Sequence, residues 1–505
     1  MSIGHTRILG AMALALGVPL VATPASAINT QTVTCYEDDN TVSPPSPPGN
    51  TCPYVNLESL DPLPTSPTNL LGNADPVIRW QSGSGSSATM WLAYSYPAAI
   101  KRTFLSPWVV SVETHYMKTT NSGGSFGLSS GPQPSGQKMK LVPYRWDKDP
   151  RVNLFAPWGV TNSETYNLAK VGNGKWVGVR DKYWHKESQG KVYTSERLEL
   201  VMADSVDGIY TQVMNPSTTH RQLLTGTLGA PSGIGTCGAN CNGVANFEDN
   251  KGTGGSMGTG ANNNFSVVDL TALGGNDTAD CSIWLEPGLY YHTDNRLYLS
   301  SHCFALGSGS TDLSKSDTFL FRSQANPDQS HPNQWTWSYV GRLYGQTEAV
   351  ALKDAGRIEA PDDELTFTAT DIVQAADGSI IAITAPNFYP ASGGEANNGH
   401  FGCHVFKITD ITTASIERTG GNTDLPVYYG RIDTPSLMPD GYGWDGGTHN
   451  GANLSLNADP LGNSTCSYDY RATGSTVSGI IEAYKYHETD PYFQNVFMHN
   501  TKWRP

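Results

Sequence analysis

The sequence predicts an all-β protein built as a five-bladed β-propeller, with six blades as the alternative. Its 505 residues include 53 glycines and 32 prolines, which suits short strands joined by many turns. Only 15% of the residues are charged, so long solvated helices are not expected. The third observation is a strand pattern that recurs five times along the chain, as repeated blades require.

Residues 1–27 have the features of a secretory signal peptide. Arg7 precedes an apolar run over residues 8–21, and residues 25–27 (Ala-Ser-Ala) supply small side chains for cleavage. That run is shorter than the ~18 residues of a membrane-spanning helix, and no later run reaches that length. We therefore expect no membrane span and a secreted or periplasmic location.

Two low-complexity stretches divide the rest of the chain. Residues 28–66 are rich in Pro and Ser and predict an extended N-terminal arm, followed by the propeller domain over 67–505. Residues 226–264 are mostly Gly, Asn, Thr and Ser, and predict a long loop.

Eight cysteines in an exported chain favour disulfides. Cys237 and Cys241 could instead form half of a zinc site, but partner ligands are missing. Proximity in the sequence suggests the pairs Cys35–Cys52, Cys237–Cys241 and Cys281–Cys303, which leaves Cys403–Cys466.

Each repeat unit begins with an acidic or amide residue before a strand, followed by a turn and a second apolar strand. The five starts are Asp75, Glu164, Glu286, Asp371 and Asn450. Three units then share a polar turn before an aromatic strand, at 119–126, 205–210 and 322–326. The long interval from 164 to 286 leaves room for a sixth blade, but the Gly/Asn-rich loop accounts for the excess.

Because the inner strands of blades surround one channel, the residues at their starts are expected to gather at one mouth. Glycosidic bond cleavage needs one protonated carboxyl group and one carboxylate, and crowding of carboxylates separates their pKa values. The ring of acids at the unit starts therefore predicts an exported glycoside hydrolase. Acidic residues in such positions also bond backbone amides or bind structural calcium, which is the alternative interpretation.

At these residues the chain resembles the five-bladed propeller glycoside hydrolases of family 43, the arabinanase and β-xylosidase type. Asp75-Pro76, followed by Trp91-Leu-Ala-Tyr94, resembles the blade with the catalytic base, and residues 286–299 resemble the blade with the general acid. The resemblance implies Asp75 as base, Glu286 as acid and Glu164, where the family has Asp, as the residue that tunes the acid. It also implies that His449 helps to hold a metal ion or water in the channel, with calcium as the candidate ion and no cofactor required.

The turn at 119–126 resembles the Asp box of sialidases, with Asn121 in place of Asp. That turn stabilises blades, so it supports the fold more than a substrate. Two alternatives to the hydrolase stay open: a non-catalytic glycan-binding or adhesin propeller, and a sialidase-like or polysaccharide lyase propeller.

The expected partner is a carbohydrate, and the protein is expected to be a monomer. Tryptophan rings near predicted loop ends can stack on sugar faces, and Arg79 is among the arginines available for a sugar carboxylate of the kind that sialidases bind. The candidate substrate-binding residues are Trp158, Trp284, Arg79 and Trp444. With 32 basic against 46 acidic residues, the net charge of -14 argues against nucleic acid as a partner.

Overall fold

The computed structural model describes the strands and some of their connections. The described residues are 30–34, 51–56, 74–83, 89–101, 109–120, 139–141, 158–163, 166–188, 191–212, 220–226, 265–305, 316–355, 365–374, 378–388, 403–420, 425–427, 431–432, 466–473, 476–485 and 493–501. The predicted loop over 226–264 lies outside these ranges, except for residue 226.

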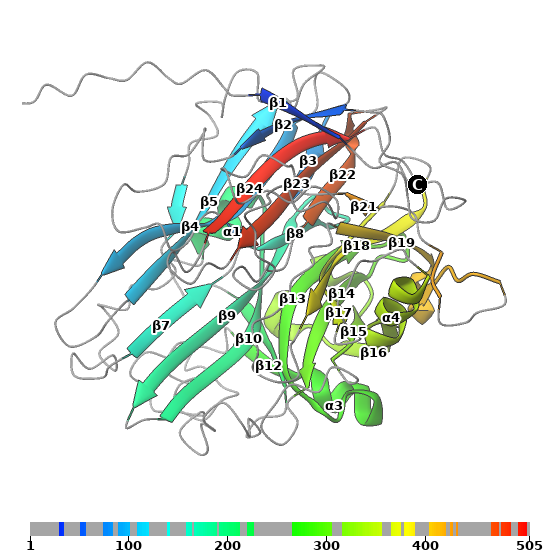
Figure 1. The fold of residues 1–505 in the computed structure, drawn as a ribbon. Helices are drawn as coiled ribbons and strands as arrows, with labels where there is room; N and C mark the ends of the chain where they lie inside the picture. Colours follow the sequence, from blue (N-terminus) through cyan, green and yellow to red (C-terminus); the bar gives the residue numbers. More distant parts are fainter. Residues whose placement is uncertain are drawn as a thin grey trace, which may run out of the picture.

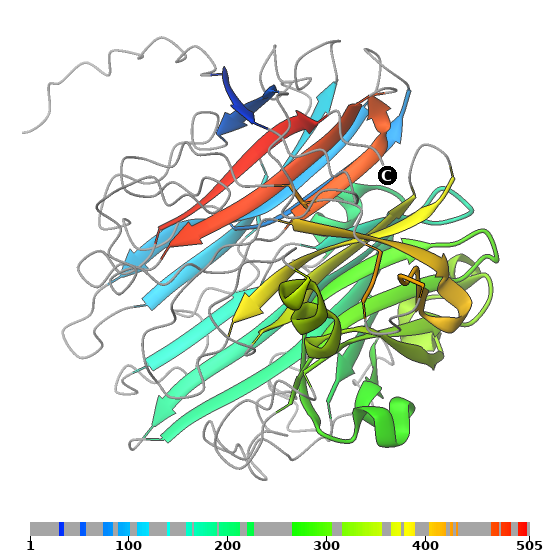
Figure 2. The same cartoon turned by 45° about the vertical axis from the view of Figure 1, so that its right-hand side comes forward.

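The described residues are mostly β-strand and form five sheets (Figures 1 and 2). Sheet 1 has the order β3 (Ala74–Ser82), β4 (Thr89–Lys101), β5 (Val109–Thr120), β6 (Met139–Leu141). Sheet 2 has the order β12 (Phe265–Asp269), β11 (Arg221–Thr225), β10 (Lys191–Ala203), β9 (Trp176–Ser188), β7 (Trp158–Ser163), and β8 (Asn167–Lys170) also pairs with β9.

In the next two sheets all neighbouring strands are antiparallel, whereas sheet 2 contains one parallel pair, β11 and β12. Sheet 3 has the order β13 (Cys281–Tyr291), β14 (Leu297–Ala305), β15 (Thr318–Ser323), β16 (Trp337–Tyr344). Sheet 4 has the order β17 (Leu365–Gln374), β18 (Ile380–Phe388), β19 (Cys403–Asp410), β20 (Ser415–Ile416), and β21 (Arg431–Ile432) also pairs with β19. These hairpins confirm the first four strand pairs of the repeat.

Sheet 5 joins the two ends of the chain. Its order is β1 (Thr30–Thr34), β2 (Thr51–Asn56), β24 (Phe493–Thr501), β23 (Thr476–Lys485), β22 (Cys466–Thr473). Two strands from the stretch predicted as an arm, residues 28–66, thus extend a sheet made by the last three strands. The start at Asn450 lies outside the described residues, and β22 is the edge strand of this sheet opposite β1.

One strand from each of the five sheets, here called the inner strand, contacts the inner strands of two other sheets in a closed ring: β3, β8, β13, β17 and β22. β3 contacts β8 and β22, β13 contacts β8 and β17, and β17 contacts β22. The ring brings together strands that are hundreds of residues apart in the sequence.

Apolar side chains fill the spaces between neighbouring sheets. One core cluster packs Val177 and Leu200 of sheet 2 against Leu299 and Phe321 of sheet 3. A second packs Tyr298 of sheet 3 against sheet 4, and a third lies between sheets 1 and 2. The aromatic and branched residues of the strands therefore stabilise sheet-on-sheet packing, which is where the burial of apolar area contributes most.

Short helices lie at the sheet edges. They are α1 (Val206–Gln212), α3 (Leu270–Gly274), α4 (Gln346–Asp354) and the 3-10 turns η4 (Gly275–Thr278), η6 (Pro327–Gln329), η7 (Pro332–Gln334) and η8 (Ile411–Thr413). The turn predicted at 205–210 is instead the beginning of α1. Ser205 starts this helix, because its Oγ accepts the Gly208 N–H at 3.0 Å in the manner of an N-cap. No helix among the described residues is long and apolar enough to span a membrane.

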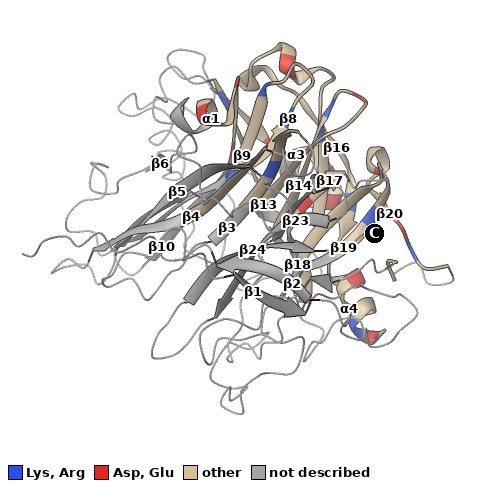
Figure 3. Cartoon of the chain, turned by 90° about the horizontal axis from the view of Figure 1, so that it is seen from above, with Lys and Arg blue, Asp and Glu red and all other residues tan. Residues whose placement is uncertain are grey.

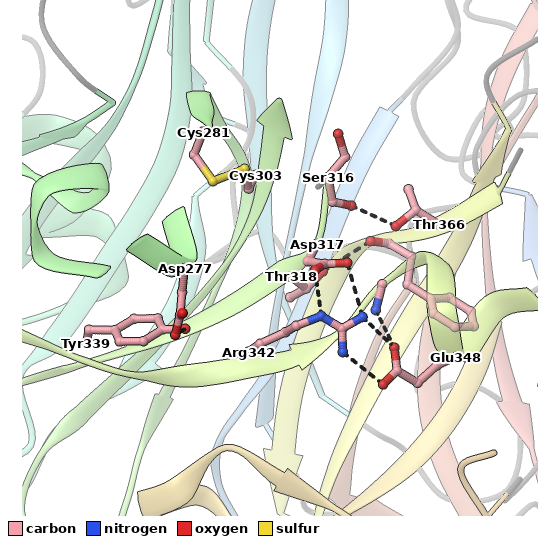
Figure 4. A network of polar contacts seen from close by, with 12 residues as sticks. Asp277, Cys281, Cys303, Ser316, Asp317, Thr318, Tyr339, Arg342, Glu348 and Thr366 are labelled. Atoms are coloured by element: carbon pink, nitrogen blue, oxygen red, sulfur yellow. Dashed lines mark hydrogen bonds and ion pairs between the residues drawn. A yellow bond between two sulfur atoms is a disulfide. The ribbon is translucent and has the colours of Figure 1, made fainter. Parts of the chain in front are cut away.

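An outer network of charged side chains links sheets 3 and 4 (Figure 4). Arg342 donates to Asp317 Oδ2 at 2.5 Å and to Glu348 Oε1 and Oε2 at 2.9 and 2.8 Å. Arg418, which follows η8, donates to Glu348 Oε1 at 2.8 Å. Glu348 also accepts the Gly345 N–H at 2.9 Å. This outer network therefore fixes α4 against both sheets.

The disulfide Cys281–Cys303 connects β13 to β14 and confirms that predicted pair. It joins two strands of one sheet near the start of the inner strand. Such a bond is typical of proteins that fold in an oxidising compartment.

Candidate functional site

The inner strands of three sheets contain bulges near their beginnings. In β13 the pairing with β14 shifts between Leu285 and Gly288, and Glu286-Pro287 occupies the gap. In β3 the shift between Ala74 and Val77 contains Asp75-Pro76. An acid followed by proline therefore stands in the same position of two inner strands. Proline suits a bulge because it has no N–H to donate to the neighbouring strand.

The inner strands of sheets 1 to 4 run in the same direction. Leu289 in β13 donates its N–H to Asn167 Oδ1 in β8 at 2.9 Å, and further along both strands Gly172 lies against Tyr291. Arg79 in β3 likewise bonds Leu168 O in β8, and Lys170 Nζ bonds Gln81 O further along. The bulges with Asp75 and Glu286 therefore lie at the same end of the ring.

The same direction holds between sheets 3 and 4. Leu285 pairs with His302, which pairs with Thr318, and Thr318 Oγ1 donates to Phe367 O at 3.1 Å. Three residues later, Gly288 of β13 lies directly against Thr370 of β17. A Cβ at Gly288 would lie 2.1 Å from the Thr370 carbonyl oxygen, so only glycine permits this approach.

Glu286 has an uncommon backbone conformation for its residue type. Its φ is 50°, and its side chain is neither buried nor fully exposed. A left-handed conformation costs a non-glycine residue on the order of 1–3 kcal/mol and persists where surrounding contacts determine it. Such conformations concentrate at functional sites, which makes Glu286 the best-supported candidate in the described residues.

Beyond the bulges, three polar side chains form the ring network: Arg79 of β3, Asn167 of β8 and Asp371 of β17. Arg79 makes a bidentate ion pair with both carboxylate oxygens of Asp371. Its Nη2 also donates to Asn167 Oδ1 at 3.0 Å, and Asn167 Nδ2 donates to Asp371 Oδ1 at 3.3 Å. In the ring, β22 lies between β3 and β17, so the ion pair connects two sheets that are not neighbours. Asn167 adds sheet 2, and its bond from the Leu289 N–H adds sheet 3, so that strands of four sheets are joined.

Arg79 is 4% exposed and Asp371 is 2% exposed. The sequence predicted Arg79 as a substrate-binding residue and Asp371 as a member of the acidic ring. The structure instead buries both in one ion pair, because a guanidinium and a carboxylate in the interior must neutralise each other. Asp371 also does not occupy the position that corresponds to Glu286: that position in the bulge of β17 is Ala369, and Asp371 lies two residues further along the strand, where β13 has Gly288.

The remaining predicted site residues have different outcomes. Trp284 is fully buried between Phe319 and Phe321, and its indole N–H bonds Thr271 Oγ1 at 3.1 Å, so no face of its ring is open to a sugar. Its apolar neighbours place it in the core. Trp158 begins β7. Glu164, Trp444 and His449 lie outside the described residues.

No group of three or more His, Cys, Asp or Glu side chains in the described ranges is arranged to hold a metal ion. Lys and Arg residues of the described part lie on several sheets and helices (Figure 3).

Sequence reasoning missed Asn167 and Gly288. Asn167 stands three residues after Glu164, and Gly288 two residues after Glu286. The signal that could have found them was the alignment of apolar strand residues, which matches Val77-Ile78, Asn167-Leu168, Gly288-Leu289 and Asp371-Ile372. Alignment on the acidic residues instead puts the second and fourth units out of register with the first and third.

No protein-family model matches this chain, and no curated protein matches it. One similar solved structure is a protein of unknown function from Dyadobacter fermentans DSM 18053, with 11% identity, a TM-score of 0.34 and coverage of 85% of this chain and 95% of that chain. A thermostable family-43 glycoside hydrolase has 7% identity, a TM-score of 0.34 and coverage of 85% and 89%. An endo-1,5-alpha-L-arabinanase from Thermotoga petrophila RKU-1 has 10% identity, a TM-score of 0.31 and coverage of 84% and 72%. At these identities and TM-scores, the description of the fold rests on the sheet order and the strand contacts above.

Proposed function

We propose that this chain is an exported glycoside hydrolase whose five sheets are the blades of a five-bladed β-propeller. The closed ring of inner strands supports the blade count. The proposed propeller spans 67–505 and follows a signal peptide over 1–27, and its sheet 5 is extended by β1 and β2 from the arm over 28–66. The disulfide Cys281–Cys303 fits a secreted or periplasmic protein.

The observation that carries the proposal is the equivalent placement of Asp75 and Glu286. Both are acids in bulges at the same end of ring strands, each followed by proline. Glycoside hydrolysis by two carboxyl groups needs such a pair on opposite sides of the scissile bond. A third acid on the ring, Asp371, is neutralised by Arg79 and is therefore unsuited to proton transfer.

In the proposed mechanism Glu286 protonates the leaving oxygen and Asp75 activates water. Inversion at the sugar carbon requires a separation of about 6.5–9.5 Å between the two carboxyl groups. Glu164 would tune the pKa of Glu286, Trp158 and Trp444 would stack on sugar rings, and His449 would help to hold a calcium ion in the channel. These four roles depend on the assignment of the two acids.

The test is hydrolysis by the purified mature protein on a panel of polysaccharides that includes arabinans, xylans, fructans and sialosides. Glu286→Gln and Asp75→Asn should each remove most of the sugar release, because each removes one required proton transfer. Glu348→Gln serves as control, since Glu348 belongs to the outer network and should leave activity unchanged. Binding of a glycan without turnover of any panel member would replace the hydrolase with a glycan-binding propeller.

A further inference from the structure

The segment that carries Glu286 is held from two sides. On one side, the Leu289 N–H donates to Asn167 Oδ1 of β8 at 2.9 Å. On the other, Gly288 lies against the Thr370 carbonyl of β17, and Ser300 Oγ also donates to that carbonyl at 3.1 Å. The backbone that follows Glu286 is therefore fixed between two neighbouring sheets.

Asn167 is itself fixed by charged partners. Its Oδ1 accepts from both Leu289 N–H and Arg79 Nη2, and its Nδ2 donates to Asp371 Oδ1. This use of acceptor and donor allows only one orientation of the amide. Because Asn167 is 7% exposed, water has little access to replace these bonds.

We infer that the ring network of Asn167, Arg79 and Asp371 positions Glu286 for its reaction. The network acts through the backbone: Asp371 holds Arg79, both hold the Asn167 amide, and Asn167 holds Leu289, three residues after Glu286. The unfavourable φ of Glu286 requires such external constraint. This inference rests on the proposed role of Glu286, and it assigns three buried residues a part in catalysis as positioning residues.

Two variants test the network at different points. Asn167→Ala removes the acceptor of the Leu289 N–H and leaves the Arg79–Asp371 pair in place, so this variant should fold. Asp371→Asn keeps the side-chain shape but removes its negative charge. Glu348→Gln is the matched control, because Glu348 is also a buried carboxylate bonded by two arginines, in the outer network.

The first readout is independent of activity. Hydrogen exchange of the peptide over 285–291 should become faster in Asn167→Ala than in the native protein, whereas Glu348→Gln should leave it unchanged. Unchanged exchange in Asn167→Ala would overturn the inference, whatever the activity of the protein.

The second readout is kinetic and uses a polysaccharide that the native protein hydrolyses. Asn167→Ala and Asp371→Asn should lower kcat roughly 10- to 100-fold with little change in KM, since misplacement of a catalytic group by about 1 Å costs on the order of 100-fold. Native kcat in folded variants would overturn positioning, even if Glu286→Gln is inactive. Activity retained in Glu286→Gln would instead remove the proposed function, while the exchange result would still report on the network.

Discussion

The ring network and the outer network both consist of arginine–carboxylate ion pairs, but their arginines differ in how far they are exposed to water. In the ring network the side chains of Arg79 and Asp371 are 5% and 3% exposed. In the outer network Glu348 is equally buried, but Arg342 and Arg418 are 31% and 32% exposed. An arginine that reaches water can be rehydrated when its partner is lost, whereas a buried arginine cannot. The comparison indicates that the ring network is the more sensitive of the two to substitution.

The largest effect is expected for Asp371→Ala. Loss of this carboxylate removes the buried negative charge that both Nη atoms of Arg79 bond, which should lower the free energy of unfolding by about 3–5 kcal/mol. Denaturant unfolding monitored by tryptophan fluorescence measures this change. The double variant Arg79→Met/Asp371→Leu is the control and should regain much of the loss, because it removes both charges. A loss below ~1 kcal/mol for Asp371→Ala would show that water reaches the ring, and would break the comparison.

The disulfide provides a reference against which the stabilisation by the ring network can be compared. Cys281 and Cys303 are 22 residues apart, and removal of a bond that closes a loop of this size costs about 2–4 kcal/mol. The double variant Cys281→Ala/Cys303→Ala should therefore be somewhat less destabilised than Asp371→Ala in the same unfolding experiment. The reverse order would mean that the ring network contributes less than the covalent connection between β13 and β14.

His302, which pairs with Leu285 of β13 and Thr318 of β15, is expected to give stability a pH dependence. It is buried in β14, and desolvation lowers its pKa to about 3 from the ordinary value of 6.5. The unfolded chain therefore binds a proton below pH 6.5 that the folded chain does not, so stability falls as pH decreases. At pH 5 this loss should reach about 2 kcal/mol relative to pH 7.

The variant His302→Leu should remove that part of the pH dependence. Unfolding free energies of both proteins at pH 7 and pH 5 measure the difference. An equal decrease in the two proteins would assign the pH dependence to other groups.

The sequence allowed the repeat to be recognised because hairpins depend on local signals. Apolar alternation and the turns at 172–174 and 293–295 predicted β8–β9 and β13–β14, and the Cys281–Cys303 pair followed from proximity. The ring network could not be predicted in this way. Arg79 and Asp371 are 292 residues apart, and their contact depends on how the sheets close around the ring. Because the carboxylate that neutralises Arg79 is remote in the sequence, nothing close to Arg79 in the sequence indicated that its side chain would be buried. It was therefore predicted to bind substrate.

The smallest effect is expected at the exposed side of the outer network. Arg418→Ala removes one bond to Glu348, which keeps those from Arg342 and the Gly345 N–H. Because Arg418 is partly exposed, the loss of stability should be within about 1 kcal/mol at neutral pH. Burial opposes ionisation of Glu348, but hydrogen bonds from Arg342 and Arg418 outweigh it and lower its pKa below the ordinary 4.5.

The stability that Glu348 contributes is therefore present above pH 4.5 and is lost as pH falls through its lower folded-state pKa. Burial raises the pKa of Asp317, the other carboxylate bonded to Arg342, so that group favours the folded state as the pH falls. Arg418→Ala removes a bond to Glu348, so the part of its small cost that comes from this bond should shrink further in acid, where Glu348 becomes protonated. A cost that stays constant from pH 7 to pH 3 would assign the effect to packing of the Arg418 stem. A cost comparable to that of Asp371→Ala would remove the distinction between buried and exposed arginines.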